Sequence, residues 1–219
     1  MIFLSYLLNT QTPSYGNRNK FEIGKQNSIA QGATANDSLI ATTVHIGTHI
    51  DMPYHFYEQG QSVESYDADF FSLNKILFLE IEPKNHVIHE ELLEKLRTVE
   101  DIGYEMLIVK TGSCIFRESE QYWKENYGFH PKIYDFLRER FTTVRIFGFD
   151  TISVSSFQDR TTGKEAHKRF LTPEKPILLL EDMDLRNISS STKFSSIIVA
   201  PLRVERCDGL PCTVMAKLA

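Results

Sequence analysis

Residues 45 to 56 read His-Ile-Gly-Thr-His-Ile-Asp-Met-Pro-Tyr-His-Phe. In an extended chain, side chains alternate between two faces, so the polar side chains at odd positions of this stretch should all point the same way. These side chains are His45, His49, Asp51 and His55. Gly47 allows close backbone approach, and Pro53 ends any regular ladder after Asp51. The stretch therefore predicts a compact, one-sided cluster of imidazoles and a carboxylate.

Such a cluster is typical of a metal site. Neutral imidazole binds zinc, iron and similar ions, and a carboxylate can bridge two of them. Without a metal, neighbouring imidazoles would compete for hydrogen bonds and repel one another once protonated. A single histidine such as His45 is more often an ordinary core or surface residue, but the group as a whole favours metal binding. The spacing is not that of a zincin, which needs Glu directly after the first His on a helix, whereas Gly47 disfavours helix.

Outside this stretch, short apolar runs alternate with amphipathic segments. The predicted buried strands are 76–81, 106–109, 144–149, 177–180 and 197–200, with an opening strand in 1–8. The predicted helices are 88–96, 121–126, 131–141 and 164–170. Residues 9–38 are rich in Asn, Gln, Ser, Thr and Gly, which indicates loops around short strands. This order predicts an α/β or α+β fold, and residues 1–219 are expected to form a single domain.

Composition excludes several classes of function. The formal net charge is -5 and no basic patch is present, so we expect no nucleic-acid partner. The apolar start lacks a positive region and is interrupted by Asn9, so we expect neither a signal peptide nor a membrane span. The three cysteines form no Cys-x-x-Cys pair, which argues against a disulfide framework, although Cys207 and Cys212 could pair across a turn. We expect a reduced, cytoplasmic protein.

The remaining histidines are less informative on their own. His86 and His89 flank the start of a predicted helix and are interpreted as exposed, and His130 as a loop residue. His167 lies fourteen residues before Glu181, which ends an apolar strand, where sites gather in α/β folds. An exposed helical His and a strand-terminal Glu would explain these last two residues equally well.

The pattern H-x-G-T-H-x-D-x-P-x-H, matched from His45 to His55, resembles the signature of the cyclase family of metal hydrolases. That family includes bacterial kynurenine formamidases and isatin hydrolases. Further segments resemble its later landmarks, so that the resemblance covers most of the chain. They are Gly32 with Asn36, Thr111-Gly112, 148–153, His167, 181–185, Pro201-Leu202 and Asp208-Gly209.

The resemblance implies a swivelling β/β/α fold with a site for two divalent ions, Zn or Mn. In the family's pattern His45, His49 and Asp51 would hold one ion, and Asp51 would bridge to a second ion bound by His167. Glu181 would also bridge or complete the pair, and His55 would be the general acid/base rather than a ligand. The family commonly assembles into homodimers or larger homo-oligomers.

The resemblance also implies a small-molecule amide substrate, with N-formyl-L-kynurenine as the first candidate. Formamidases of the family carry Trp-Pro-Gly near the N-terminus, where this chain has Tyr15, and the spacing from His167 to Glu181 is longer here. Tyr15 and Phe56 are the candidate substrate-binding residues. Isatin or another cyclic amide or ester is the alternative substrate. A metal-binding protein without catalysis, or a scaffold with a chance histidine cluster, are the alternatives from other classes.

Overall fold

The computed structural model describes residues 1–219. Its β-strands are β1 (Ile2–Phe3), β2 (Glu22–Asn27), β3 (Asp37–Ala41), β4 (His49–Asp51), β5 (Ser72–Leu73), β6 (Ile76–Glu80), β7 (Val87–Ile88), β8 (Met106–Lys110), β9 (Gly128–Phe129), β10 (Ile146–Phe149), β11 (Leu178–Glu181), β12 (Phe194–Pro201) and β13 (Gly209–Leu218). Its α-helices are α1 (Glu90–Arg97), α2 (Gln121–Lys124), α3 (Lys132–Arg140) and α4 (Arg160–Phe170). Short 3-10 helices connect them, and one of these, η3 (Pro53–His55), belongs to the candidate site.

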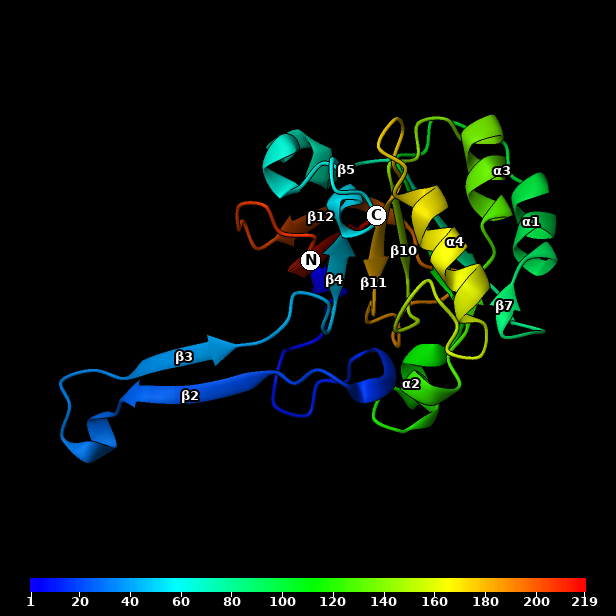
Figure 1. Ribbon diagram of the computed structural model, residues 1–219. Helices are drawn as coiled ribbons and strands as arrows, with labels where there is room; N and C mark the ends of the chain where they lie inside the picture. Colours follow the sequence, from blue (N-terminus) through cyan, green and yellow to red (C-terminus); the bar gives the residue numbers. More distant parts are fainter.

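Nine strands form one mixed sheet in the order β5-β12-β13-β4-β11-β10-β8-β6, with β1 beside β13. Strands β6, β8, β10 and β11 are parallel, as expected for strands joined by crossover helices. The short strand β4 runs antiparallel to both of its neighbours, β11 and β13. Helices α1, α3 and α4 lie together beside the parallel strands (Figure 1). The predicted α/β class is confirmed.

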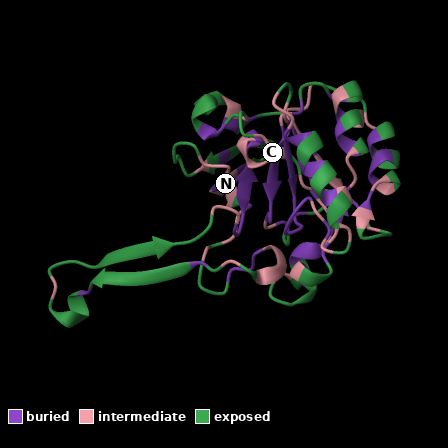
Figure 2. Ribbon diagram, in the orientation of Figure 1, coloured by how far each residue is buried: buried purple, intermediate pink, exposed green.

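The parallel strands form the centre of the hydrophobic core. Strands β10 and β11 are buried along their whole length, as is β8 up to its last residue, because helices and neighbouring segments cover them (Figure 2). Strand β12 instead alternates in burial along its second half, as a strand with one solvated face does. None of the helices has the length and apolar character needed to cross a membrane. The buried parallel strands thus provide a well-packed support for the candidate site.

The predicted strands and helices are all present, with ends shifted by a few residues. The opening strand is shorter than predicted, because only Ile2 and Phe3 pair with β13. The longest strand, β13, was not predicted. It contains Pro211 and Lys217 and mixes buried with exposed positions, so it lacks the continuous apolar run by which the other strands were identified. All three cysteines are free.

Strands β2 and β3 form a hairpin that projects from the body of the molecule as an arm (Figure 1). Every residue of both strands is exposed. Ile23 and Ile40 are paired across the hairpin, and 52% and 61% of their surfaces are accessible. The prediction of loops around short strands for residues 9–38 is correct here, since the arm spans most of that segment and a few residues beyond it.

A buried ion pair fixes the chain just after β11. Arg117 donates from Nε and Nη2 to the carboxylate of Asp182, at 2.8 and 2.6 Å, and the Tyr122 hydroxyl donates to Oδ1 at 2.5 Å. Only 1% of the Asp182 side chain is exposed. The Arg117→Ala variant should therefore lose about 3–5 kcal/mol of unfolding free energy, because a buried carboxylate would be left without its counter-charge. Urea denaturation measures this loss.

The matched control is Arg186→Ala. The guanidinium groups of Arg117 and Arg186 both lie over the Tyr6 ring. Arg186 pairs with Asp184, but half of the Arg186 side chain is exposed. An exposed pair of this kind contributes about 0–1 kcal/mol. Equal losses in the two variants would show that burial of the Arg117 pair has no special effect on stability.

Candidate active site

The candidate site lies at the middle of the sheet, where β4 enters between β11 and β13. His49 and Asp51 are two apart on β4 and therefore face the same side. Glu181 ends β11 directly opposite His49 in the antiparallel register, which places its side chain on that side as well. All three side chains are buried. The strand pairing thus builds a buried group of one imidazole and two carboxylates.

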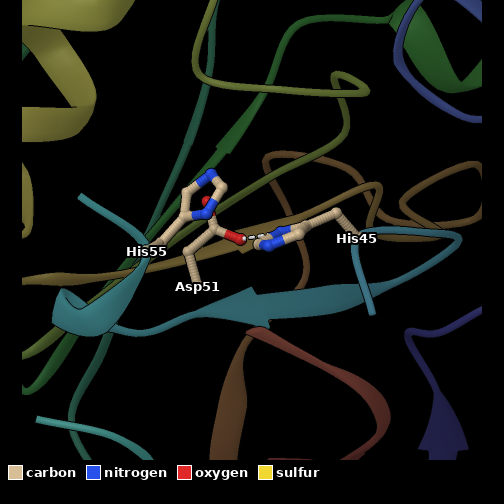
Figure 3. Close-up of side chains that lie close together, drawn as sticks. All are labelled: His45, Asp51 and His55. Atoms are coloured by element: carbon tan, nitrogen blue, oxygen red, sulfur yellow. Dashed lines mark hydrogen bonds and ion pairs between the residues drawn. The ribbon is translucent and has the colours of Figure 1, made fainter. Parts of the chain in front are cut away.

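His45 and His55 reach the site from outside β4. His45 precedes the strand and is turned toward it by Gly47, whose φ of +61° favours glycine. His55 ends the 3-10 helix η3, which Pro53 begins. The prediction that all four polar residues alternate along one extended segment is therefore wrong for His45 and His55. Both side chains still arrive at the cluster, because the chain folds back at each end of the short strand (Figure 3).

His167 completes the cluster from helix α4, where it lies buried on the face that packs toward the sheet. Its Nε2 is 3.5 Å from Oδ2 of Asp51 and 3.7 Å from Oε1 of Glu181. On the other side of the carboxylates, His49 Nε2 is 3.4 Å from Oδ1 of Asp51 and 3.5 Å from Oε2 of Glu181. Each carboxylate therefore has one oxygen toward His49 and the other toward His167.

Hydrogen bonds fix which nitrogen of these two imidazoles faces the carboxylates. His49 Nδ1 lies 2.8 Å from the carbonyl oxygen of Gly47, and His167 Nδ1 lies 3.0 Å from that of Gly163. A carbonyl only accepts, so both Nδ1 atoms carry the hydrogen, and in the neutral rings Nε2 carries the lone pair. Such outer partners are typical of histidines that bind metals.

This donor set fits divalent metal ions. Lone pairs of Nε2 that face carboxylate oxygens are unfavourable unless a cation lies between them. The separations of 3.4–3.7 Å are longer than hydrogen bonds. They match the roughly 3.4 Å between neighbouring ligands of a tetrahedral ion with bonds of about 2.0–2.2 Å. The carboxylate and imidazole donors suit zinc, manganese and related ions.

The charges of the two buried carboxylates also favour a bound cation. Burial and the neighbouring charge of Asp51 raise the pKa of Glu181 well above its ordinary value. Burial would raise the pKa of Asp51 as well, but the positive charge of His45 beside it holds the pKa well below its usual range. Two carboxylates in one buried pocket therefore repel each other, and a bound cation would remove that repulsion.

One carboxylate in the site was not singled out as a site residue from the sequence. Oδ2 of Asp208 lies 2.7 Å from Nε2 of His45 and 3.0 Å from Nδ1 of His55. The rings of His45 and His55 are 4.0 Å apart. In the sequence, Asp208 belongs to a C-terminal segment that resembles the family pattern, without a role of its own. Nothing in the local sequence indicates which of the many aspartates folds back onto a site more than 150 residues away.

A cavity of about 200 Å³ opens over the cluster. His45, His49, Asp51, His55, His167 and Glu181 all line it, as does the predicted substrate residue Tyr15. The Tyr15 hydroxyl donates to the carbonyl oxygen of Ser156, which fixes the ring at the wall. Phe56 lies outside the lining and stacks on the His167 imidazole, with ring centres 4.9 Å apart. Its contact is with a candidate ligand rather than with the cavity.

The position of His45 depends on the glycine that follows Asp208. A methyl group added at Gly209 would lie 2.5 Å from Cε1 of His45. We expect Gly209→Ala to displace the imidazole and weaken metal binding by about 10–100-fold, as loss of a supporting contact typically does. The control is Gly24→Ala in the arm, where the added methyl would meet only Leu39 Cβ at 3.8 Å. Titration with a metal-binding dye measures both affinities, and an unchanged affinity in Gly209→Ala would contradict this prediction.

Sequence comparison finds a family model and named relatives that match most of the chain. Residues 2–156 match the family model Cyclase, described as “Putative cyclase”. “Cyclase-like protein 3” of Oryza sativa subsp. japonica is 26% identical over 193 residues, which cover 84% of this chain and 66% of the rice protein. The “Kynurenine formamidase” of Bacillus cereus (strain ATCC 14579) is 23% identical over 216 residues, covering 99% of this chain and 96% of the relative.

Solved structures agree on the fold. “Isatin hydrolase A” from Labrenzia aggregata superposes with a TM-score of 0.80 at 18% identity, covering 98% of this chain and 92% of that one. A “predicted metal-dependent hydrolase from Bacillus stearothermophilus” superposes with a TM-score of 0.76 at 18% identity, covering 98% and 96%. These likenesses confirm the mixed α/β fold that the sequence resemblance implied.

Proposed function

The chain belongs to the Cyclase family, and we propose on that premise that it is a metal-dependent hydrolase that cleaves an amide bond of a small aromatic substrate. The observation that carries the proposal is the double-sided arrangement of Asp51 and Glu181. Each carboxylate presents one oxygen to His49 and the other to His167, as expected for residues that bridge two ions.

We assign His45, His49 and Asp51 to one ion, and His167 to the second, with Asp51 and Glu181 shared. Zinc and manganese are the candidate metals, because both accept imidazole and carboxylate ligands. When bound, such ions polarise a carbonyl and lower the pKa of bound water towards ~7. In each of these imidazoles, the nitrogen that faces away from Asp51 and Glu181 is hydrogen-bonded to Gly47, Gly163 or Asp208. These bonds keep the other nitrogen, the ligand atom, directed at Asp51 and Glu181.

His55 is the proposed general acid/base. His55 lines the cavity, but it is not paired with Glu181 as His49 and His167 are. Its Nδ1 is hydrogen-bonded to Asp208. The other nitrogen, Nε2, is left to carry a proton to the leaving nitrogen of the amide. Proton transfer by a placed side chain of this kind contributes about 10²–10⁴-fold to the rate. An acid/base group beside the ligands distinguishes a reactive site from a closed structural metal site.

N-formyl-L-kynurenine is the first substrate to test. Relatives named kynurenine formamidase align with nearly the whole chain in Bacillus cereus and Geobacillus thermodenitrificans. Tyr15 provides an aromatic face at the cavity wall, at the position where the sequence pattern of the formamidases has Trp. The reaction would be hydrolysis of the formamide to L-kynurenine and formate.

A cyclic amide of the isatin type is the second candidate, and the cavity favours it in two respects. Its volume of about 200 Å³ is small compared with the ~300–1,000 Å³ of pockets for larger ligands. No Lys or Arg lines it, so the cavity offers no ammonium or guanidinium group to the amino-acid carboxylate of N-formyl-L-kynurenine. A compact, uncharged ring does not need one.

The test is hydrolysis of both substrates by protein loaded with zinc or manganese, with and without a chelator. We expect turnover of at least one amide that stops when the chelator is added, with an unchanged circular dichroism spectrum. Turnover of isatin alone would select the second candidate. Unfolding on chelation would instead indicate a structural ion, and bound metal with hydrolysis of neither substrate would contradict both assignments.

We further propose that the chain forms a homodimer or a larger homo-oligomer, as the family resemblance implies. The exposed arm supports this proposal, since a two-stranded hairpin alone in water is only marginally stable. The Ile23–Ile40 pair would be covered in such an assembly. Light scattering on purified protein gives the mass, and a monomer at micromolar concentration would contradict the proposal.

A further inference from the structure

We infer that Asp208 is a positioning residue that joins the proposed acid/base His55 to the proposed metal ligand His45 in one hydrogen-bonded unit. The inference rests on the proposed function and deepens it, since it adds a residue to the site that neither the histidine motif nor the metal cluster includes. The carboxylate comes from the far end of the chain, 163 residues from His45 and 153 from His55.

A single oxygen makes both contacts. Oδ2 of Asp208 accepts from Nε2 of His45 at 2.7 Å and from Nδ1 of His55 at 3.0 Å. An ionised carboxylate can only accept, so each ring must present an N–H at that nitrogen.

The two contacts have different consequences for the two rings. Nδ1 of His45 lies 2.9 Å from Oδ1 of Asp51 and donates to it in this structure. Because Asp208 holds the hydrogen on Nε2, Nδ1 is the nitrogen that would give up its hydrogen to bind an ion beside Asp51. Donation from Nδ1 leaves Nε2 of His55 as the atom that can exchange a proton with substrate. One carboxylate thus selects the ligand atom of one imidazole and the reactive atom of the other, as a carboxylate does for the histidine of a catalytic triad.

The backbone holds Asp208 in place independently of its side chain. Its carbonyl oxygen accepts from the amide of Met52, the residue after Asp51, at 3.0 Å. The next residue, Gly209, pairs with Asp51 between β13 and β4. Removing the carboxylate should therefore leave the chain path intact, so that the effect on the two rings can be measured separately from folding.

The alternative is an ordinary surface ion pair, since 41% of the Asp208 side chain is exposed. Such pairs contribute little, and breaking one would change neither metal binding nor turnover. The two views differ in what they predict for the kinetics and for the tautomers of the rings.

The experiment compares Asp208→Ala and Asp208→Asn with Asp208→Glu and with Glu205→Gln, an exposed residue of the same loop. With saturating zinc, we expect kcat for the amide substrate to fall about 10–100-fold in Asp208→Ala and Asp208→Asn while KM changes less than about threefold. Zinc affinity should fall over a similar range. Asp208→Glu should recover part of both losses, and Glu205→Gln should match the unmodified protein.

Nitrogen-15 NMR of the histidine side chains tests the inference even if no substrate is turned over. In the zinc-loaded protein we expect His55 to carry its hydrogen on Nδ1 and His45 on Nε2. In Asp208→Ala, His55 should lose this preference and show a mixture of tautomers. Unchanged tautomers and unchanged zinc affinity in Asp208→Ala would overturn the role of Asp208. If Asp208→Ala loses the tautomer preference but the unmodified protein hydrolyses no amide, only the proposed function is contradicted.

Discussion

Replacing Asp51 by alanine is expected to abolish binding of both ions and to lower kcat/KM by about 10³-fold or more, which corresponds to several kcal/mol of transition-state stabilisation. Oδ1 of Asp51 faces His45 and His49, and Oδ2 faces His167. Asp51 is the only residue that connects all three imidazoles, so neither half of the site keeps its full donor set without it. Elemental analysis after dialysis gives the metal content per chain.

A matched control is Asp150→Asn, which changes another fully buried carboxylate. Asp150 accepts from the amide of Thr111 at 2.7 Å and from that of Gly112 at 2.9 Å, and so joins β8 to the end of β10 without contacting the cluster. This variant should lose about 1–3 kcal/mol of unfolding free energy but keep its metal. Two ions per chain in Asp51→Ala would rule out the bridging role.

The histidine motif was readable from sequence because its residues are close together along the chain. Alternation correctly placed His49 and Asp51 on one face, since β4 is a real strand. It failed for His45 and His55, because Gly47 adopts a left-handed conformation and Pro53 starts a 3-10 helix. The cluster formed nevertheless, through turns whose direction no local periodicity predicts.

The other site residues depend on pairing between distant strands. Glu181 faces His49 only because β11 lies beside β4. Asp208 reaches the site only because β13 pairs with the opposite edge of β4. Local apolar patterns identify strands but not their neighbours. The family resemblance supplied Glu181 and His167, whose geometry agrees with the proposed roles. It supplied no role for Asp208, which became visible only in the folded chain.

Replacing His55 by alanine should separate chemistry from metal binding. We expect kcat to fall about 10²–10⁴-fold, the contribution of a general acid/base, with both ions retained and KM nearly unchanged. His86→Ala is the control, because His86 is exposed and lies next to Tyr127, away from the site. Steady-state kinetics and metal content on the same samples give both quantities.

The metal content of this variant decides between two roles for His55. A nitrogen of His55 lies within 4.8 Å of ligand atoms of His45 and Asp51, so these three residues could also hold an ion (Figure 3). Loss of one ion from His55→Ala would make His55 a ligand and remove it from proton transfer. Retention of both ions is expected, because Nδ1 of His55 is already bonded to Asp208 and Glu181 lies with His49 and His167. Slow turnover with full metal would then leave proton transfer to the leaving nitrogen as the step that His55 performs.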